Sequence, residues 1–321
     1  MTKFAILGYG FMGKKHFDAI AQHPDAEVSA LIDLNLQHRP DLGHYQGLDA
    51  FLHDSPLADV VIIATPNARH CSEAEILLNR GYNVLVEKPY CLSSQEADRL
   101  IQTAEKQNKN LFLAHQNRHS PISKFLKNIL SENQLGKIYF VQTNLLWSRD
   151  EKYYQKGSWK GTKTQDGGTL YTQFFHFIDL ILWLFGEIEV QNATAKTLRH
   201  NHLVEIEDTG TFTYTLTETE GLGVVNFSTA VCRKNLESSM TIIAEKGTLK
   251  ISGQYFDRIE FCDIEGLEDS APLFELQGNP NNLVASVQEI CKALQTAPNY
   301  AEARKGLNVV KKIEAIYACL S

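Results

Sequence analysis

The sequence lacks any apolar run that approaches the about 20 residues needed to cross a membrane. The longest candidate, around Phe174–Phe185, is interrupted by His176 and Asp179. Only a short stretch precedes the first glycine turn at Gly8, so we expect no signal peptide. These absences predict a soluble, cytoplasmic protein without a membrane partner.

Cysteines at redox or metal-binding spacing are also missing. The chain has no C-x-x-C pair and no cysteine with a histidine at zinc spacing. The six cysteines are Cys71, Cys91, Cys232, Cys262, Cys291 and Cys319. We therefore expect reduced, mostly buried cysteines, with neither a disulfide framework nor a metal site.

Basic charge is scarce, because 31 Lys and Arg stand against 38 Asp and Glu, for a formal net charge of −7. This balance argues against a nucleic-acid partner, whose phosphates require a basic surface. With 43% hydrophobic and 21% charged residues, the composition is that of a globular protein. At about 100–200 residues per domain, 321 residues predict two domains.

The first part of the chain, residues 1–118, alternates short apolar runs with helical patterns. Because the runs are apolar throughout rather than alternating, we expect a parallel sheet covered by helices on both faces, as in a Rossmann domain. The expected strands are 3–7, 27–32, 59–64, 83–86 and 111–114, and the helices include one up to residue 23, 68–80 and 94–109.

Residues 119–321 have a different pattern, which predicts a substrate and oligomerisation domain of the α+β class. Strands follow one another between residues 187 and 261 without helices between them, which is typical of an open, mainly antiparallel sheet. A helix after Pro121, a strand at 137–146, a long buried helix at 168–184 and two closing helices at 283–294 and 301–318 complete the expected order.

A glycine turn, Gly8-Tyr9-Gly10-Phe11-Met12-Gly13, fits G-x-G-x-x-G between the first strand and the first helix. We expect Gly8 to permit the tight turn and Gly10 to let the backbone approach a pyrophosphate. Gly13 would let the helix pack closely on the strand. The N–H groups at the helix start, which include those of Phe11 and Met12, would then bind the anion.

Asp33 ends the second strand, 20 residues after Gly13. An acid at this position hydrogen-bonds the adenosine ribose, and its charge repels the 2′-phosphate of NADP. The sequence therefore predicts an NAD site.

The glycine turn and three further segments together resemble the Gfo/Idh/MocA family of sugar and polyol oxidoreductases. The further segments are Ala64-Thr65-Pro66-Asn67-Ala68-Arg69-His70, Glu87-Lys88-Pro89 and the helical stretch from Gly167 to Asp179. The resemblance spans the chain and implies a homodimer or homotetramer. It also implies cofactor contacts at Thr65, Pro66, Asn67, His70, Glu87 and Lys88.

The resemblance implies that Lys88 and His176 are catalytic. A histidine titrates near neutrality and can take the hydroxyl proton, while a lysine ammonium stabilises charge on the carbinol oxygen. The chain departs from the polyol dehydrogenases at Thr172, where they carry an aspartate four residues before the histidine. Asp179 is an alternative proton relay, and Asp166, in place of the first glycine of a triplet, is expected to affect only the turn.

The segments 147–161, Gln116-Asn117-Arg118 and 232–237 resemble one branch of the family, the UDP-N-acetylglucosaminuronate 3-dehydrogenases of bacterial O-antigen synthesis. Four cations within twelve residues, Arg149, Lys152, Lys156 and Lys160, suit a diphosphate and a carboxylate. The expected substrate contacts are Arg118, Arg149, Tyr154, Trp159, Lys160, Thr172, Gln173 and Asp179.

Two alternatives remain open at this stage. A dehydrogenase of a free sugar or polyol would use the same chemistry, although Thr172 and the cationic segment favour the sugar nucleotide. A non-catalytic sensor that only binds the dinucleotide would have no need of both Lys88 and His176.

Overall fold

The computed structural model describes residues 1–35, 42–155, 157–267 and 282–320. By its internal contacts the chain divides into two units. Unit 1 is Met1–Gln116 with Asn281–Val310, and unit 2 is Asn117–Pro280 with Lys311–Ser321.

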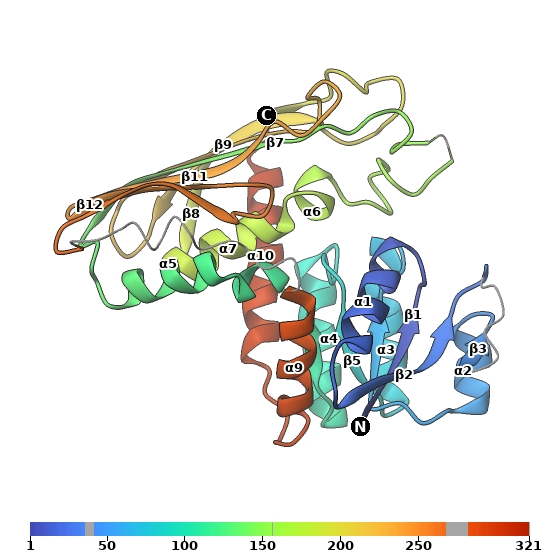
Figure 1. The fold of residues 1–321 in the computed structure, drawn as a ribbon. Helices are drawn as coiled ribbons and strands as arrows, with labels where there is room; N and C mark the ends of the chain where they lie inside the picture. The colour runs from blue at the N-terminus through green and yellow to red at the C-terminus, as the bar shows by residue number, and fades with distance from the viewer. Residues whose placement is uncertain (36–41, 156, 268–281, 321) are drawn as a thin grey trace. The chain divides into compact units, whose positions relative to one another are not determined.

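Unit 1 is built on a six-stranded parallel sheet (Figure 1). Its strands are β1 (Thr2–Leu7), β2 (Ala26–Ile32), β3 (Gly43–Tyr45), β4 (Val60–Ile63), β5 (Asn83–Val86) and β6 (Leu111–Leu113). The spatial order β3-β2-β1-β4-β5-β6 reverses direction between β1 and β4. Doubly wound sheets bind ligands at the carboxyl ends of the strands beside such a reversal, which is where the glycine turn lies.

Helices connect and cover these strands. They are α1 (Phe11–Ala21), α2 (Leu48–Asp54), the short η1 (Asn67–Arg69), α3 (His70–Asn79), α4 (Ser94–Gln107), α9 (Asn282–Ala293) and the first part of α10 (Ala301–Ala318). Local sequence sets the bounds of α4, because the Ser93 hydroxyl accepts the Glu96 N–H at 3.2 Å and Asn108 ends the helix at φ 51°. The strand β3 and helix α2 were absent from the sequence-based prediction.

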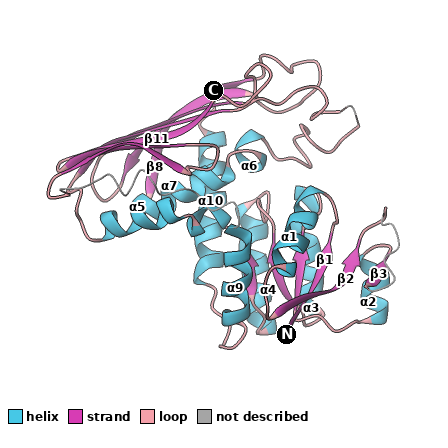
Figure 2. Cartoon of the chain, viewed as in Figure 1, coloured by secondary structure: helices cyan, strands magenta, loops and turns pink. Residues whose placement is uncertain are grey.

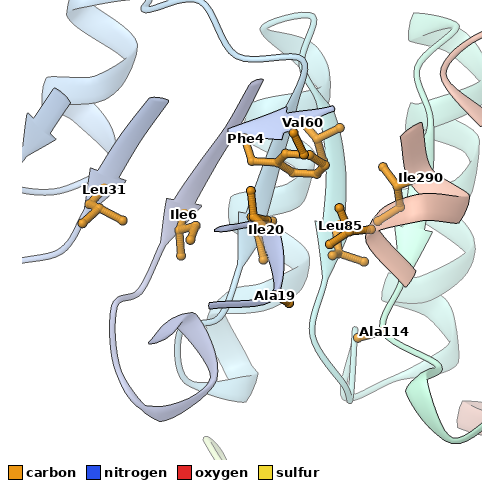
Figure 3. Close-up of a cluster of buried hydrophobic side chains, with 12 residues drawn as sticks. Phe4, Ile6, Ala19, Ile20, Leu31, Val60, Leu85, Ala114 and Ile290 are labelled. Atoms are coloured by element: carbon orange, nitrogen blue, oxygen red, sulfur yellow. The ribbon is translucent and has the colours of Figure 1, made fainter. Parts of the chain in front are cut away.

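The core of unit 1 joins the sheet to helices from both ends of the chain. Figure 3 shows Phe4 and Ile6 of β1, Ile20 of α1 and Ile290 of α9 among its members. All four side chains are buried. The prediction that residues 119–321 form the second domain therefore differs from the structure: the boundary near residue 118 agrees within two residues, but α9 packs on the dinucleotide-type sheet because its apolar face completes that core.

Unit 2 contains a seven-stranded sheet, drawn in magenta at the top of Figure 2. Its strands are β7 (Ile138–Leu146), β8 (Ile188–Lys196), β9 (Thr209–Leu216), β10 (Leu222–Ser228), β11 (Glu237–Ala244), β12 (Gly247–Ser252) and β13 (Arg258–Ile264). The order is β13-β12-β11-β7-β10-β9-β8, and every pair is antiparallel except β7 with β10. The predicted mainly antiparallel sheet is confirmed.

Unit 2 contains most of the short η2 (Gln116–His119), α5 (Pro121–Ser131), α6 (Thr169–Thr172), α7 (Phe175–Phe185) and the last part of α10. Aromatic side chains hold the start of α7 against the sheet: Phe174 lies 5.3 Å from Trp147 and 6.0 Å from Phe227 of β10, between ring centroids. Phe177 lies 4.9 Å from Phe256. This packing fixes the position of His176, which lies between the two phenylalanines in the sequence.

The predicted single helix over 168–184 is wrong. It consists of α6 and α7, separated at Gln173 and Phe174. The packing of Phe174 into the aromatic cluster explains the break, because a continuous helix would direct side chains by its own periodicity. Thr172 and His176 therefore lie on different helices rather than one turn apart on the same one.

The cysteines are less buried than predicted. Among the six, Cys71 and Cys91 are buried, Cys262 and Cys291 are intermediate, and Cys232 and Cys319 are exposed; all six are free thiols. Within the described ranges, no helix is long and apolar enough to cross a membrane. In the same ranges no group of His, Cys, Asp or Glu is arranged to hold a metal ion.

Candidate functional site

Two of the three glycines in the turn of unit 1, Gly8 and Gly13, have a steric reason. Gly8 has φ +92°, and a Cβ there would come within 2.7 Å of the Ala64 carbonyl carbon. A Cβ on Gly13 would lie 2.1 Å from the Gly8 carbonyl oxygen, so α1 packs on the turn as closely as glycine permits. Gly10 differs, because no atom lies within 4 Å of its Cβ position. The turn therefore leaves open space only over Gly10.

Asp33 is attached to this turn. Its Oδ2 accepts the backbone N–H of Tyr9 at 2.7 Å, and its Oδ1 accepts that of Asn35 at 2.9 Å. The carboxylate at the end of β2 is thereby held beside the glycine turn at the end of β1, in the arrangement that dinucleotide-binding folds use for the ribose.

The segment after β4 is fastened to the segment after β5 through His70. The His70 Nε2 lies 2.7 Å from the Thr65 carbonyl oxygen, and its Nδ1 lies 2.7 Å from that of Pro89. The ring is buried, and burial lowers its pKa more than these two carbonyl contacts raise it. Thr65 also donates its hydroxyl to Glu73 at 2.5 Å. We therefore assign to His70 the role of a tie between the two loops.

A buried pair supports Lys88, and the sequence analysis missed one of its members. His16 of α1 places its Nε2 2.7 Å from the Glu87 Oε1, and both side chains are buried. The other oxygen of Glu87 accepts the Lys88 backbone N–H at 3.1 Å. The sequence did offer one indication of a role for His16, namely its position on the inner face of the first helix, three residues after Gly13. This pair holds the Glu-Lys-Pro segment against the helix that follows the glycine turn.

These residues fit a dinucleotide. No side chain caps the N-terminus of α1, and its N-cap residue is Gly10, over which the open space lies. Phe11 is 74% exposed and Met12 is partly exposed, so the first helical turn is accessible. Uncapped N–H groups at a helix start, without Cβ atoms in front of them, form a site for a pyrophosphate. Pro66 is partly exposed and Asn67 is buried in the neighbouring loop after β4.

In unit 2, His176 is buried near the start of α7, and two of the predicted substrate contacts are bound to each other. The Arg118 Nε donates to the Asp179 Oδ2 at 2.9 Å, and its Nη2 donates to Oδ1. Their side chains are 7% and 1% exposed. Arg118 and Asp179 thus balance each other's charge within unit 2, and their contact with a substrate stays a prediction.

Asp166 does more than shape a turn, contrary to the prediction. It is buried, and its Oδ2 accepts the Gly161 N–H at 2.7 Å while its Oδ1 accepts the Thr172 hydroxyl. The carboxylate that polyol dehydrogenases carry at the position of Thr172 is thus replaced by a threonine that is bound to a nearby carboxylate. Asp166 also ties Gly161, which follows the cationic segment, to the C-terminal end of α6.

The cationic segment itself carries an interconnected polar cluster. The Arg149 Nε donates to the Gln173 Oε1 at 2.8 Å, and the Gln173 Nε2 donates to the Tyr153 hydroxyl at 2.6 Å. The Lys160 Nζ lies 4.0 Å from the centre of the Tyr153 ring, and the Arg149 guanidinium lies 5.1 Å from it. The predicted contacts Arg149, Lys160, Gln173 and Thr172 therefore lie in one region, together with Tyr153, whose ring was expected to offer a face to a sugar or uracil.

Other predicted contacts have different surroundings. Tyr154 is 2% exposed and packs edge-on against Tyr153, so it belongs mainly to the core. Trp159 is partly exposed, and its carbonyl accepts the Thr162 hydroxyl at 2.8 Å. Lys156, one of the four predicted cations, lies outside the described residues.

A partly buried acid supports the start of α6 and was not predicted. The Glu207 Oε1 accepts the Tyr317 hydroxyl at 2.6 Å and the Thr169 N–H at 2.9 Å. Burial raises the pKa of Glu207. The Tyr317 oxygen stands 2.1 Å from where a Cβ on Gly168 would be, which explains a glycine at that position. The sequence alone could not show this contact, because Glu207 lies just before β9 and Tyr317 lies in the last helix, far along the chain.

Comparison with known families gives two matches. Residues 2–115 match the model described as "Oxidoreductase family, NAD-binding Rossmann fold", and residues 124–250 match the GFO/IDH/MocA C-terminal domain. The first match covers most of residues 1–116 of unit 1, and the second covers most of residues 117–280 of unit 2.

Solved structures resemble the whole chain. The WlbA dehydrogenase of Chromobacterium violaceum in complex with NADH and UDP-GlcNAcA is 28% identical, with a TM-score of 0.88 over 99% of this chain and 93% of that one. The WlbA dehydrogenase of Bordetella pertussis in complex with the same two ligands is 28% identical, with a TM-score of 0.86 and coverages of 99% and 95%.

Curated relatives match over a shorter length. The glucose-6-phosphate 3-dehydrogenase of Bacillus subtilis is 28% identical over 193 residues, 58% of this chain and 54% of the relative. A putative UDP-kanosamine synthase oxidoreductase subunit of Amycolatopsis mediterranei is 30% identical over 191 residues, 58% of this chain and 52% of the relative. The match thus spans about half the length of these relatives.

Proposed function

The chain belongs to the GFO/IDH/MocA family of NAD-binding oxidoreductases, and from this premise we propose that it oxidises a secondary hydroxyl of a sugar. NAD supplies the hydride acceptor when it is bound. The observation that carries the proposal is the glycine turn, with open space over Gly10 and the Asp33 carboxylate fixed to the Tyr9 N–H.

For the substrate we propose a UDP-linked N-acetyl-hexuronic acid, oxidised at C3 as a step in surface-polysaccharide synthesis. The likeness to two structures that contain NADH and UDP-GlcNAcA supports this choice. The grouping of Arg149 and Lys160 in unit 2 supports it independently, because a uronate and a diphosphate are both anions. The cofactor contacts remain those predicted after β1, β2, β4 and β5.

The catalytic roles follow the chemistry of alcohol oxidation. We propose that the His176 imidazole accepts the hydroxyl proton as the carbon loses its hydride. The Lys88 ammonium stabilises the negative charge that develops on the oxygen. Each side chain is well supported for such a role: Lys88 by the buried pair of His16 with Glu87, and His176 by the aromatic packing on either side of it.

A free sugar or a sugar phosphate is the second candidate substrate, because one relative is named for glucose 6-phosphate. The test is to incubate the purified protein with NAD and to follow NADH absorbance with UDP-GlcNAcA, UDP-GlcNAc, glucose 6-phosphate, glucose and inositol. We expect UDP-GlcNAcA to give the highest kcat/KM. Turnover of glucose 6-phosphate or inositol, without turnover of UDP-GlcNAcA, would reject the sugar nucleotide and keep the dehydrogenase.

The catalytic assignment has its own test. Lys88→Met and His176→Asn should each lower kcat by about 10²–10⁴, the range for general acid–base groups, while NAD still stabilises both variants against heat. Full activity in either variant would reject its role, and loss of NAD binding in either one would show that it serves the cofactor instead.

We also propose a homo-oligomer that associates through the outer face of the seven-stranded sheet. Tyr139 of β7 and Ile243 of β11 are 48% and 41% exposed, and the residues on either side of Ile243 are buried. Sedimentation should find a dimer or tetramer, and Ile243→Lys should shift it toward the monomer. A monomeric wild type would reject this assembly.

A further inference from the structure

Arg149 and Lys160 are two cations held against one aromatic ring. Both are partly buried, and their charged groups lie 5.1 Å and 4.0 Å from the centre of the Tyr153 ring. Arg149 acts on Lys160 as a like charge. Two neighbouring positive charges in a partly desolvated place disfavour each other, and this repulsion opposes folding unless an anion is present.

The protein does not supply that anion within the part of the chain that the structure describes. There, neither cation forms an ion pair with a carboxylate. The Arg149 Nε and Nη1 are bound to neutral oxygens, those of Gln173, Ser148 and Asn235. The neutral partners orient the guanidinium without neutralising it, which leaves its charge for a ligand.

The carboxylate that acts on Lys160, that of Asp166, is hydrogen-bonded to other groups. Asp166 favours the charged form of Lys160, but burial and the charge of Arg149 outweigh it, and the pKa of Lys160 is lowered. Both oxygens of Asp166 accept hydrogen bonds from other groups, the Gly161 N–H and the Thr172 hydroxyl. Asp166 thus secures the residue that follows Lys160, and it holds the lysine in place rather than pairing with it.

We propose that Arg149 and Lys160 form a subsite for one anionic group of the substrate, a carboxylate or a diphosphate, with Tyr153 as the spacer between the cations. This inference rests on the proposed function and adds to it which side chains read the charge of the sugar nucleotide. Gln173 completes the subsite, since its amide binds the Tyr153 hydroxyl and Arg149 at once. Arg149, Tyr153 and Lys160 lie in the segment that joins β7 to α6 (Figure 1), and Gln173 directly follows α6.

The experiment measures the dissociation constants of UDP, UDP-GlcNAc and UDP-GlcNAcA by calorimetry in the presence of NADH. The proteins are the wild type, Arg149→Gln, Lys160→Gln and the matched control Lys163→Gln, which removes an exposed lysine of the same segment. We expect roughly 10-fold or greater weakening in the first two variants, the usual effect of losing a hydrogen bond to a charged group. The control should bind as the wild type does.

The three ligands identify the group that is bound. If the subsite takes the carboxylate, only UDP-GlcNAcA weakens, down to the affinity of UDP-GlcNAc. If it takes the diphosphate, all three ligands weaken alike. The melting temperature of unliganded Lys160→Gln should equal or exceed that of the wild type, because a repulsive charge has been removed; a lysine with a merely structural role would lower it.

Two failures remain distinguishable. A wild type that oxidises UDP-GlcNAcA, with both variants binding all three ligands as Lys163→Gln does, would overturn the subsite and leave the function standing. A wild type that binds none of the three nucleotides would overturn the proposed substrate and the subsite together.

Discussion

Gly10 and Gly13 give a direct test of the cofactor site, because the same substitution should have opposite effects at the two positions. A Cβ on Gly13 would meet the Gly8 carbonyl oxygen at 2.1 Å, while a Cβ on Gly10 meets nothing within 4 Å. Gly10 also has φ −77°, which any residue adopts, so alanine is not strained there. Gly13→Ala should therefore disturb the fold, whereas Gly10→Ala should disturb only what binds over the turn.

The expected sizes follow from these contacts. Overpacking typically costs about 1–3 kcal/mol, so Gly13→Ala should lower the melting temperature of the unliganded protein by several degrees. Gly10→Ala should leave it unchanged or raise it slightly, since alanine reduces the entropy of the unfolded chain by about 0.4–1 kcal/mol. With NAD at 100 times its dissociation constant, the wild type should gain about 2.7 kcal/mol, and Gly10→Ala should lose most of that gain.

Scanning calorimetry with and without NAD measures both quantities on the same samples. We expect Gly10→Ala to be as stable as the wild type without NAD and not to be stabilised by NAD. We expect Gly13→Ala to be less stable than the wild type before NAD is added. A Gly10→Ala protein with the full NAD shift would refute the placement of the pyrophosphate over Gly10. A Gly13→Ala protein as stable as the wild type would refute the close packing of α1 on the turn.

Three further outcomes are expected. The wild type should bind NAD more tightly than NADP, and Asp33→Ala should reduce that preference; tighter NADP binding by the wild type in calorimetry would reject the ribose role of Asp33. Asp179→Asn should lower the free energy of unfolding by about 3–5 kcal/mol in urea, because it leaves the buried Arg118 guanidinium without its carboxylate, and a loss below 1 kcal/mol would reject a structural pair. The pKa of Asp208 is lowered, since burial raises it but backbone N–H groups of residues 198–200 and a hydroxyl outweigh burial. Its ionised form therefore stabilises the fold above the unfolded pKa, and this contribution is lost as the pH falls through the folded pKa. Asp208→Asn should melt at a lower temperature than the wild type at pH 7, and the two melting temperatures should converge below about pH 4. A constant difference in melting temperature across this range would contradict the assignment.

The first unit was predictable where its features are local. Gly8, Gly10 and Gly13 lie in one strand–turn–helix, and Gly8 and Gly13 each have a steric reason that involves the turn or the adjacent strand end. The strands β1, β2, β4, β5 and β6 were predicted within two residues, because apolar runs flanked by turns identify buried parallel strands. Asp33 follows from the same pattern, since it ends a strand at a fixed distance from the turn.

Tertiary structure alone decided the pairings between distant segments. His16 meets Glu87 across 71 residues, and Arg118 meets Asp179 across 61. A sequence shows the charges of such residues but not which of them neutralise each other, so neither the pairing of Arg118 with Asp179 nor the hydrogen bonds of Asp166 could be predicted. The break between α6 and α7 and the attachment of α9 to the first unit have the same origin. In both cases the packing of apolar side chains, Phe174 in one core and Ile290 in the other, overrides what the local pattern indicates.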